Sequence, residues 1–341
     1  MLIRSKAPLR IGLAGGGTDV SPYSDLYGGA ILNATINLYA YTTIEPLDNG
    51  KIELVNDTTN ETLTVDSALV LEHNKAFELV IGVYNRVVKD FAHKPLSFRL
   101  TSHIEAPQGS GLGTSSTIMV SLLGAFVEWL NIPLGNYDIA HLAYDIERVD
   151  LAMAGGKQDQ YAATFGGVNF MEFLANDRVI VNPLHLKQEV INELDLSILL
   201  YYTATQRSSA KIITDQVANV HNKNVQAIDA MHNLKDQAIH MKEALLRGEL
   251  HKLGEVLQHG WHNKKLMAAS ITNTQIDELY NAALAAGATG GKISGAGGGG
   301  FMFFYCPSTT KNKVARALQH FGGNVQSFKL TPHGLTTWTI L

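Results

Sequence analysis

The segment 107–116 (PQGSGLGTSS) has the composition of a phosphate-binding loop. Its three glycines leave room for a phosphate to approach the backbone, and the helix predicted to follow points its N-terminal amides and positive dipole end at the bound anion. The hydroxyls of Thr114, Ser115 and Ser116 can cap that helix or coordinate a phosphate-bound Mg²⁺. The segment lacks the Gly-Lys-Ser/Thr ending of the common P-loop. A tight turn with a Ser/Thr cap is an equally weighted alternative.

A second glycine cluster, 295–300 (GAGGGG), satisfies the spacing of a dinucleotide-binding fingerprint. That fingerprint follows a strand and opens a helix, whereas this cluster precedes the apolar strand predicted over 301–305, so we reject a dinucleotide site. Five glycines in six residues carry a large conformational entropy cost. Close approach of the backbone to a ligand or to another loop explains them better than a flexible linker.

The third segment, 8–19 (PLRIGLAGGGTD), is a strand that runs into a glycine turn and ends in a hydroxyl and a carboxylate. Asp19 can accept hydrogen bonds from sugar hydroxyls, and Arg10 can face a phosphoryl group during transfer. Taken alone, an aspartate in this position is more typical of a turn or a helix cap.

Two further carboxylates complete the candidate set. Asp159, in the stretch GGKQDQY, can orient or deprotonate a hydroxyl nucleophile, and Glu147, on a predicted helix, can hold hydrated Mg²⁺. Each alone is more typical of a surface or capping carboxylate. Three glycine loops combined with two separated carboxylates indicate phosphoryl transfer, in which catalysis rests on positioning and charge stabilisation.

Composition bounds the class of protein. The 341 residues include 27 basic and 31 acidic side chains, for a formal net charge of −4, and no polybasic run occurs. We therefore expect no nucleic-acid partner and no membrane partner. Cys306 is the only cysteine, which excludes an internal disulfide and a multi-cysteine metal site. The longest apolar stretch, 118–130, is interrupted by polar residues, and a cytoplasmic location is expected.

Hydrophobic periodicity predicts an α+β protein with a domain boundary near residue 190, dividing it into 1–190 and 191–341. Predicted strands cover 2–13, 30–45, 51–55, 61–65, 97–104, 168–173, 196–203, 290–294, 301–306, 325–330 and 335–341. Predicted helices cover 77–91, 114–130, 139–153, 208–246, 249–267, 274–286 and 310–320.

Taken in chain order, the glycine segments 8–19, 107–116 and 295–300 resemble the three motifs of the GHMP kinases. This superfamily is named after galactokinase, homoserine kinase, mevalonate kinase and phosphomevalonate kinase. The likeness covers nearly the whole chain. Segments 15–19, 156–161, 205–210 and 261–266 resemble the sugar 1-kinase branch. The resemblance implies an N-terminal ribosomal-protein-S5-like domain and a C-terminal ferredoxin-like domain, with ATP and sugar in the cleft between them.

The resemblance also implies a role for each matching residue. The loop that would bind ATP phosphates comprises Gly109, Ser110, Gly111, Leu112, Gly113, Thr114, Ser115 and Ser116. Ser115 and Glu147 would hold Mg²⁺, although Thr114 stands where the family more often has serine, which leaves the metal-bound hydroxyl open. Asp159 would act on the anomeric hydroxyl as base or orienting carboxylate, and Arg10 would neutralise charge there. Residues lining the sugar pocket would be Gly16, Gly17, Thr18 and Asp19.

The implied reaction is ATP-dependent phosphorylation of the C1 hydroxyl of D-glycero-D-manno-heptose 7-phosphate, by a monomer or homodimer. A substrate that already carries phosphate needs a second cationic pocket, for which Arg207 is the leading candidate. Lys264 and Lys265 are weaker candidates, because adjacent lysines on a helix usually form a solvated face. Alternatives are an L-fucokinase-like enzyme, a diphosphomevalonate decarboxylase-type enzyme and a non-catalytic sugar or nucleotide sensor.

Overall fold

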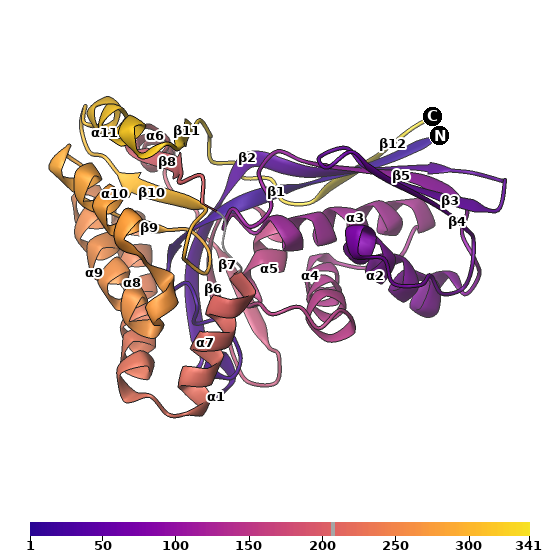
Figure 1. Cartoon of the computed structure of the whole chain (residues 1–341), viewed down its shortest axis with the longest axis horizontal. Coiled ribbons are helices and arrows are strands. Elements are labelled where there is room, and N and C mark those ends of the chain that lie inside the picture. Colours follow the sequence, from indigo (N-terminus) through magenta and orange to yellow (C-terminus); the bar gives the residue numbers. More distant parts are fainter. Residues whose placement is uncertain (206–208) are drawn as a thin grey trace.

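The computed structural model describes residues 1–205 and 209–341 and contains two β-sheets that lie on either side of a central cleft (Figure 1). Two long strands, β1 (Leu2–Ala14) and β2 (Gly29–Pro46), run through most of the molecule. The amino and carboxyl ends lie side by side, because β12 (Thr336–Ile340) pairs antiparallel with β1. The mixed helix and sheet content confirms the predicted α+β class.

The first sheet has the strand order β12-β1-β2-β5-β3-β4, and β6 and β7 extend it from β2. Its further strands are β3 (Lys51–Asn56), β4 (Glu61–Asp66), β5 (Phe98–Ile104), β6 (Val168–Phe173) and β7 (Val179–Pro183). In β5 alternate residues are buried, as expected for a strand with one face on a core. The helices of this half are α1 (Tyr23–Tyr27), α2 (Glu78–Val87), α3 (Thr114–Leu130), α4 (Asn136–Asp145) and α5 (Gln158–Phe165).

The second sheet has the order β11-β8-β10-β9 and is antiparallel throughout. Its strands are β8 (Ile198–Tyr202), β9 (Gly290–Ile293), β10 (Phe301–Tyr305) and β11 (Asn324–Gln326). Helices fall between β8 and β9 and between β10 and β11, which gives the β-α-β-β-α-β succession of ferredoxin-like folds. The helices are α6 (Gln188–Ser197), α7 (Ser209–His221), α8 (Val225–Arg247), α9 (Leu253–Met267), α10 (Thr274–Ala285) and α11 (Lys311–Leu318).

Most predicted elements are present, and the differences have local causes. The helical periodicity predicted over 208–246 corresponds to two helices, α7 and α8. Helix α7 ends at His221, Lys223 has a positive φ of 53°, and Asn224 caps α8 by accepting from the Ala227 amide at 3.1 Å. The helix predicted over 139–153 is α4 followed by a π-helical turn, 146–150. The sequence prediction missed α1, α5, α6 and β7.

The domain division near residue 190 stays a prediction. Residue 190 lies within α6, and the last strand, β12, pairs with β1 of the first sheet. One continuous core also contains residues from both sheets. It includes Leu9 and Ile11 of β1, Met241 of α8, and Leu200 and Phe303 of the second sheet. The two halves are therefore packed together over buried apolar surface.

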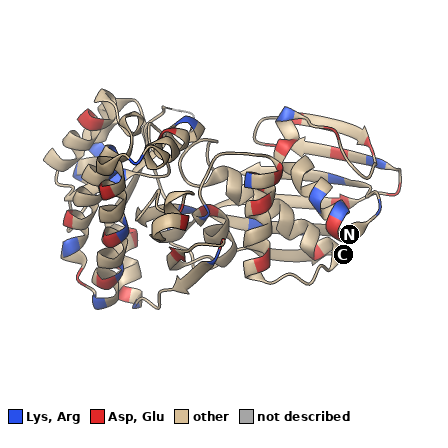
Figure 2. Ribbon diagram, turned by 90° about the horizontal axis from the view of Figure 1, so that it is seen from below, with Lys and Arg blue, Asp and Glu red and all other residues tan. Residues whose placement is uncertain are grey.

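Basic and acidic residues are interspersed along the ribbon at both ends of the molecule (Figure 2). Every helix in the described part of the chain is too short or too polar to cross a bilayer.

The glycine clusters 109–113 and 295–300 pack against each other. The Phe301 amide donates to the Ser110 carbonyl at 2.8 Å, and the Ser294 hydroxyl donates to the Gly111 carbonyl at 2.9 Å. A Cβ on Gly111 would lie 2.4 Å from the Ser294 carbonyl oxygen, and one on Gly300 would lie 2.4 Å from that of Ser110. The second cluster thus approaches another loop, as the sequence predicted, and it opens a strand rather than a helix.

This contact distinguishes two neighbouring glycines. Both Gly109 and Gly111 have positive φ, at 70° and 81°, but only a Cβ on Gly111 meets other atoms within 4 Å. Gly109→Ala should lower the free energy of unfolding by about 1 kcal/mol, the cost of a left-handed alanine. Gly111→Ala should cost roughly 2 kcal/mol more, because backbone atoms must move. Urea unfolding of both variants tests this, and equal losses would contradict the docking of the two loops.

Candidate active site

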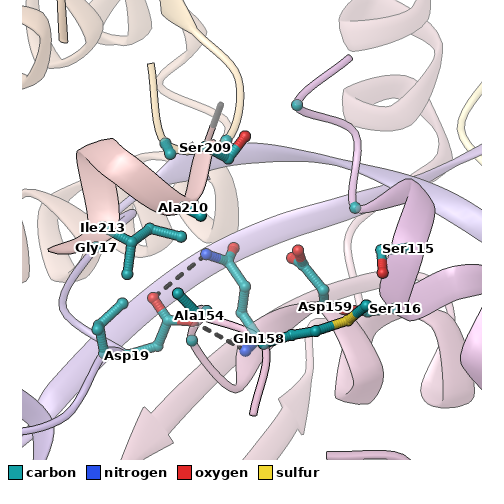
Figure 3. Close-up of a pocket in the computed structure, with 18 of the residues that line it drawn as sticks. Gly17, Asp19, Ser115, Ser116, Ala154, Gln158, Asp159, Ser209, Ala210 and Ile213 are labelled. Atoms are coloured by element: carbon teal, nitrogen blue, oxygen red, sulfur yellow. Dashed lines mark hydrogen bonds between the residues drawn. The ribbon is translucent and has the colours of Figure 1, made fainter. Parts of the chain in front are cut away.

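A cleft of about 360 Å³ lies where the two halves meet, and Figure 3 shows side chains that line it. Its walls come from the β1–α1 loop, the loop before α3, the segment leading into α5, and helices α7 and α9. The cleft brings together most of the predicted site residues: Arg10, Gly17, Asp19, Gly109, Gly111, Gly113, Thr114, Ser115, Ser116, Glu147 and Asp159.

Arg10 and Asp159 form a close ion pair in this cleft. Two nitrogens of the Arg10 guanidinium, Nε and Nη2, lie 2.7 and 2.5 Å from Oδ1 of Asp159, and a third, Nη1, donates to the Gly111 carbonyl at 2.7 Å. Arg10 is 3 % exposed. The pairing register of β1 with β2 shifts between Pro8 and Arg10, and the Arg10 amide donates to the Leu112 carbonyl at 3.2 Å. Among the described residues, Oδ2 of Asp159 has no hydrogen-bond partner and so is open to an acceptor hydroxyl.

The loop before α3 has the form expected of an anion site. Gly113 precedes the helix with a φ of 80°, and a Cβ there would lie 3.2 Å from the Asp159 carboxylate carbon. The first turn of α3, which carries Thr114, Ser115 and Ser116, therefore points at the side of the cleft where Asp159 lies. Ser110 and Leu112 are fully buried behind the loop and do not line the cleft.

Glu147 lies in the π-helical turn after α4 and is 1 % exposed. Its carboxylate accepts hydrogen bonds from the Ser115 hydroxyl, the Ser116 hydroxyl and the Gln160 amide, each at 2.7 Å, and Arg148 lies 3.3 Å away. Ser115 and Glu147 thus present hard oxygen donors side by side at the cleft wall, a donor set that fits Mg²⁺. No cluster of three His, Cys, Asp or Glu suited to a metal occurs in the described ranges.

Asp19 positions the start of α5. Its carboxylate accepts from the Gln158 backbone amide at 3.0 Å and from the Gln158 side chain at 3.3 Å (Figure 3). Burial raises the pKa of Asp19, Asp159 adds to that rise, and the Gln158 amide and Arg10 oppose it. A Cβ on Gly156 would lie 2.0 Å from the Asp19 carboxylate, so a glycine is required there.

The predicted sugar-pocket residues differ in their exposure to the cleft. Gly17 and Asp19 line it, whereas Thr18 is fully buried, donating to the carbonyls of Gly15 and Ala30 at 2.8 and 3.0 Å and accepting from the Ala30 amide. The Thr18 hydroxyl therefore holds the turn together. Gly16 does not line the cleft, and Arg207 lies outside the described residues.

The adjacent lysines of α9 occupy different environments. Lys264 is 1 % exposed and lines the cleft, while the Lys265 ammonium lies 3.4 Å from Asp277 of α10. Lys264 donates to the Gly16 carbonyl at 3.4 Å, and the buried Lys292 of β9 donates to the Gly12 carbonyl at 2.9 Å. Burial lowers the pKa of Lys264 to about 8, with Arg10 adding to the effect and Asp19 opposing it.

Sequence analysis missed several residues of the cleft. Gln158, Gln160 and Arg148 each contact a predicted site carboxylate, but polar residues of these types carry no motif of their own. Lys264 is only a weak candidate for phosphate binding when it is considered together with Lys265 as a pair of adjacent lysines on a solvated face. The helical periodicity of α9 could have assigned the two lysines to different faces.

A second cavity, of about 650 Å³, adjoins the cleft and shares Gly109, Thr114, Ser115 and Met153 with it. Its other walls include Phe77, Val80, Ile104 and Ile118. The N-terminus of α3 therefore lies between this cavity, whose walls are partly polar and partly apolar, and the cleft that holds the Arg10–Asp159 pair.

These features define an ATP-dependent phosphotransferase, and the chain belongs to the GHMP kinase family. Residues 78–167 match the GHMP kinase N-terminal domain, and residues 241–324 match the GHMP kinase C-terminal domain. The chain is an enzyme of this family, as the sequence motifs predicted.

Two relatives match this chain over nearly the full length of both proteins, and a third matches it over part of a longer protein. The chain is 46% identical over 338 residues to D-glycero-alpha-D-manno-heptose 7-phosphate kinase of Campylobacter jejuni, covering 99% of both chains. The crystal structure of a D-glycero-D-manno-heptose 1-phosphate kinase from Bacteroides thetaiotaomicron is 47% identical, with a TM-score of 0.86 and 99% coverage of both chains. The bifunctional fucokinase/GDP-fucose pyrophosphorylase of Arabidopsis thaliana is 26% identical; the match covers 91% of this chain and 30% of that protein.

The buried Lys264 predicts a pH-dependent gain in stability on its replacement. Its pKa falls from 10.5 in the unfolded chain to about 8 in the folded one, so the folded protein binds the proton less tightly. Lys264→Met should raise the free energy of unfolding by about 3 kcal/mol at pH 7. The gain should be complete below pH 8 and should fade as the pH rises from about 8 to 10.5, where both states lose the proton.

Urea unfolding at pH 7 and pH 10 measures this difference. Lys265→Met is the matched control, because the Lys265 side chain is 33% exposed and its pair with Asp277 is near the surface. The control should change stability by less than about 1 kcal/mol at both pH values. A Lys264→Met variant that is less stable than the parent at pH 7 would contradict the cost assigned to the buried ammonium.

Proposed function

We propose that the protein transfers the γ-phosphoryl group of ATP to the anomeric C1 hydroxyl of D-glycero-D-manno-heptose 7-phosphate, forming the 1,7-bisphosphate and ADP. The observation that carries the proposal is the Arg10–Asp159 pair beside the loop before α3, in a chain nearly half identical to a heptose 7-phosphate kinase over its whole length. The pair lies where an acceptor hydroxyl and a terminal phosphate would meet.

In this proposal Asp159 receives the acceptor. Oδ1 is held by Arg10, and Oδ2 accepts the hydrogen bond of the C1 hydroxyl and aligns it, taking its proton as the new bond forms. The C1 oxygen attacks the γ-phosphorus, the bond from phosphorus to the β,γ-bridging oxygen breaks, and ADP leaves with that electron pair. Arg10, at 2.5 Å from Asp159, lies close enough to offset negative charge on the transferring group.

The nucleotide occupies the two adjoining cavities. The 650 Å³ cavity has room for the adenine ring and ribose, and the loop 109–116 at its boundary receives the phosphates. Residues that support this placement from behind are Ser110 and Leu112, which hold the loop against the second glycine cluster and β1.

Mg²⁺ belongs to the proposal as well. Ser115 and Glu147 would hold it, since their oxygens lie 2.7 Å apart at the wall of the cleft. When bound, the ion would neutralise charge on the β- and γ-phosphates. Gln160 and Arg148 keep the Glu147 carboxylate oriented towards α3.

The acceptor fits between Asp159 and Asp19. Gly16, Gly17, Thr18 and Asp19 remain the proposed sugar-pocket residues, with Thr18 acting through the turn rather than by direct contact. Arg207 remains a proposed ligand of the substrate phosphate on sequence grounds alone. A cytoplasmic location and a monomeric or homodimeric state also remain predictions.

An ADP-release assay tests the reaction and its acceptor. We expect turnover with D-glycero-D-manno-heptose 7-phosphate and none with heptose 1-phosphate, L-fucose or mevalonate, because only the first has a phosphate and a free C1 hydroxyl. The 1-phosphate arm matters, since the names of the two full-length relatives place the phosphate differently. ADP release with L-fucose alone would move the assignment to the fucokinase alternative, and binding without turnover would favour a sensor.

Asp159→Asn tests the catalytic carboxylate in the same assay. The asparagine amide has the same shape as the carboxylate, but it cannot take a proton and carries no charge to form an ion pair with Arg10. The value of kcat should therefore fall about 10²- to 10⁴-fold. Nucleotide affinity should change little. Asp145→Asn is the control, because Asp145 lies outside the cleft, 3.6 Å from His141. Near-normal turnover by Asp159→Asn would remove Asp159 from the mechanism.

Glu147→Gln tests the metal site. Loss of the carboxylate charge should raise the Mg²⁺ concentration needed for half-maximal ATP-analogue binding by roughly tenfold. This is the usual loss of metal affinity when a group that supports a metal site is removed. Titration of Mn²⁺, followed by electron paramagnetic resonance with the nucleotide analogue present, gives a readout independent of turnover. Asp145→Asn again serves as control, and an unchanged metal affinity would refute the assignment of Glu147.

A further inference from the structure

Two buried ammonium groups lie together beside the sugar-pocket loop. Lys264 and Lys292 are 1 % and 3 % exposed, and a Cβ placed on Gly16 would lie 3.7 Å from both of their Nζ atoms. In the described part of the chain, each donates to a backbone carbonyl and neither has a carboxylate partner within 4.0 Å. Burial lowers the pKa of both lysines, that of Lys292 well below its ordinary value, and a counter-ion placed beside them would favour their charged forms.

The neighbouring charged groups do not supply that counter-ion. Arg10 adds positive charge, and Asp159 is already paired with it at 2.5 Å. Asp19 is the one nearby carboxylate that interacts with Lys264, and both of its oxygens are engaged by Gln158. With both lysines protonated, positive charge exceeds negative charge among these side chains, and this excess attracts an anionic group such as a phosphate monoester.

Lys264 lies near Asp19 and the sugar-pocket loop. Asp159 contacts that loop at Gly113, and Asp19 lies on the far side of Gln158 from Ser115 and Ser116 (Figure 3). Lys264 interacts with Asp19 and with the Gly16 carbonyl. An acceptor whose reacting hydroxyl is at Asp159 and whose body extends towards Asp19 would thus bring its other end to Lys264.

We propose that Lys264, with Lys292 behind it, binds the phosphate group that the acceptor sugar already carries, so that this lysine selects sugar phosphates over free sugars. The inference rests on the proposed function and assigns a residue to the recognition of its substrate. Lys264 lines the cleft and makes the contact, whereas Lys292 does not line it and acts by adding charge from β9. Gly16 contributes by having no side chain, which leaves the space beside both ammonium groups free.

Calorimetric titration of the full chain tests this role. The two ligands are D-glycero-D-manno-heptose 7-phosphate and unphosphorylated D-glycero-D-manno-heptose, each with a non-hydrolysable ATP analogue and Mg²⁺ present. The variants are Lys264→Met, Lys264→Arg and the matched control Lys265→Met, whose ammonium lies against Asp277 rather than in the cleft.

In Lys264→Met, affinity for the 7-phosphate should fall roughly 30-fold or more, the usual scale for truncating one partner of a buried charged pair. Affinity for the free sugar should change by less than about threefold. Lys264→Arg should recover part of the loss because it keeps the charge, and Lys265→Met should match the parent.

Three outcomes would overturn the proposal. The first is a Lys264→Met variant that keeps its preference for the 7-phosphate. The second is an equal loss of affinity for both sugars, which would indicate a structural role. The third is a fall in kcat with both acceptors at unchanged affinity, which would place Lys264 on the transferring group. A parent protein that releases no ADP with any sugar defeats the proposed function instead, so the two failures are distinguishable.

Discussion

One backbone carbonyl holds the three glycine segments together. The Gly111 oxygen accepts from the Arg10 guanidinium at 2.7 Å and from the Ser294 hydroxyl at 2.9 Å, so β1, the loop before α3 and the segment after β9 meet at a single atom. The same guanidinium pairs with Asp159, which lies in the first turn of α5. This junction fixes the distance between the loop before α3 and the Asp159 carboxylate. Glycines at 111, 295 and 300 are required since any Cβ there would separate the loops.

Much of the fold follows from local sequence pattern. Helix α3 has a glycine loop before it and an apolar face, and β10 is an unbroken run of buried apolar and aromatic residues, so both were predictable from their own residues. Helix α5 was not, because its first amide is capped by Asp19, which lies 139 residues earlier in the chain. Its eight residues are too few to show periodicity, and Gln160 and Thr164 are buried beside alanines.

The candidate site likewise contains residues that could be predicted from the sequence and residues that could not. Arg10, Asp159 and Glu147 were found because each lies in or near a glycine-rich motif whose chemistry narrows the choice of partner. The difference between Lys264 and Lys265 could not be found in that way, since it depends on which neighbour packs against each face of α9. The β1–α1 loop covers one lysine and α10 pairs with the other. Helical periodicity can place Lys264 on the apolar face of α9, but burial of its charge is a tertiary property that depends on the segments packed against that face.

The charges of the cleft are divided between the two halves of the molecule. The carboxylates Asp19, Glu147 and Asp159 come from segments packed on the first sheet, together with the loop for the nucleotide. The ammonium groups of Lys264 and Lys292 come from α9 and β9 of the second half. The residues that we propose for nucleotide binding and acceptor alignment therefore belong to the half that contains the first sheet, and the lysines that we assign to acceptor selection belong to the half that contains the second. The two halves are coupled at the Gly111 carbonyl, because Ser294, which follows β9, donates to the same oxygen as Arg10. A residue of α9 or β9 that selects the acceptor must therefore be accommodated without moving that oxygen, since it helps to hold Arg10 against Asp159.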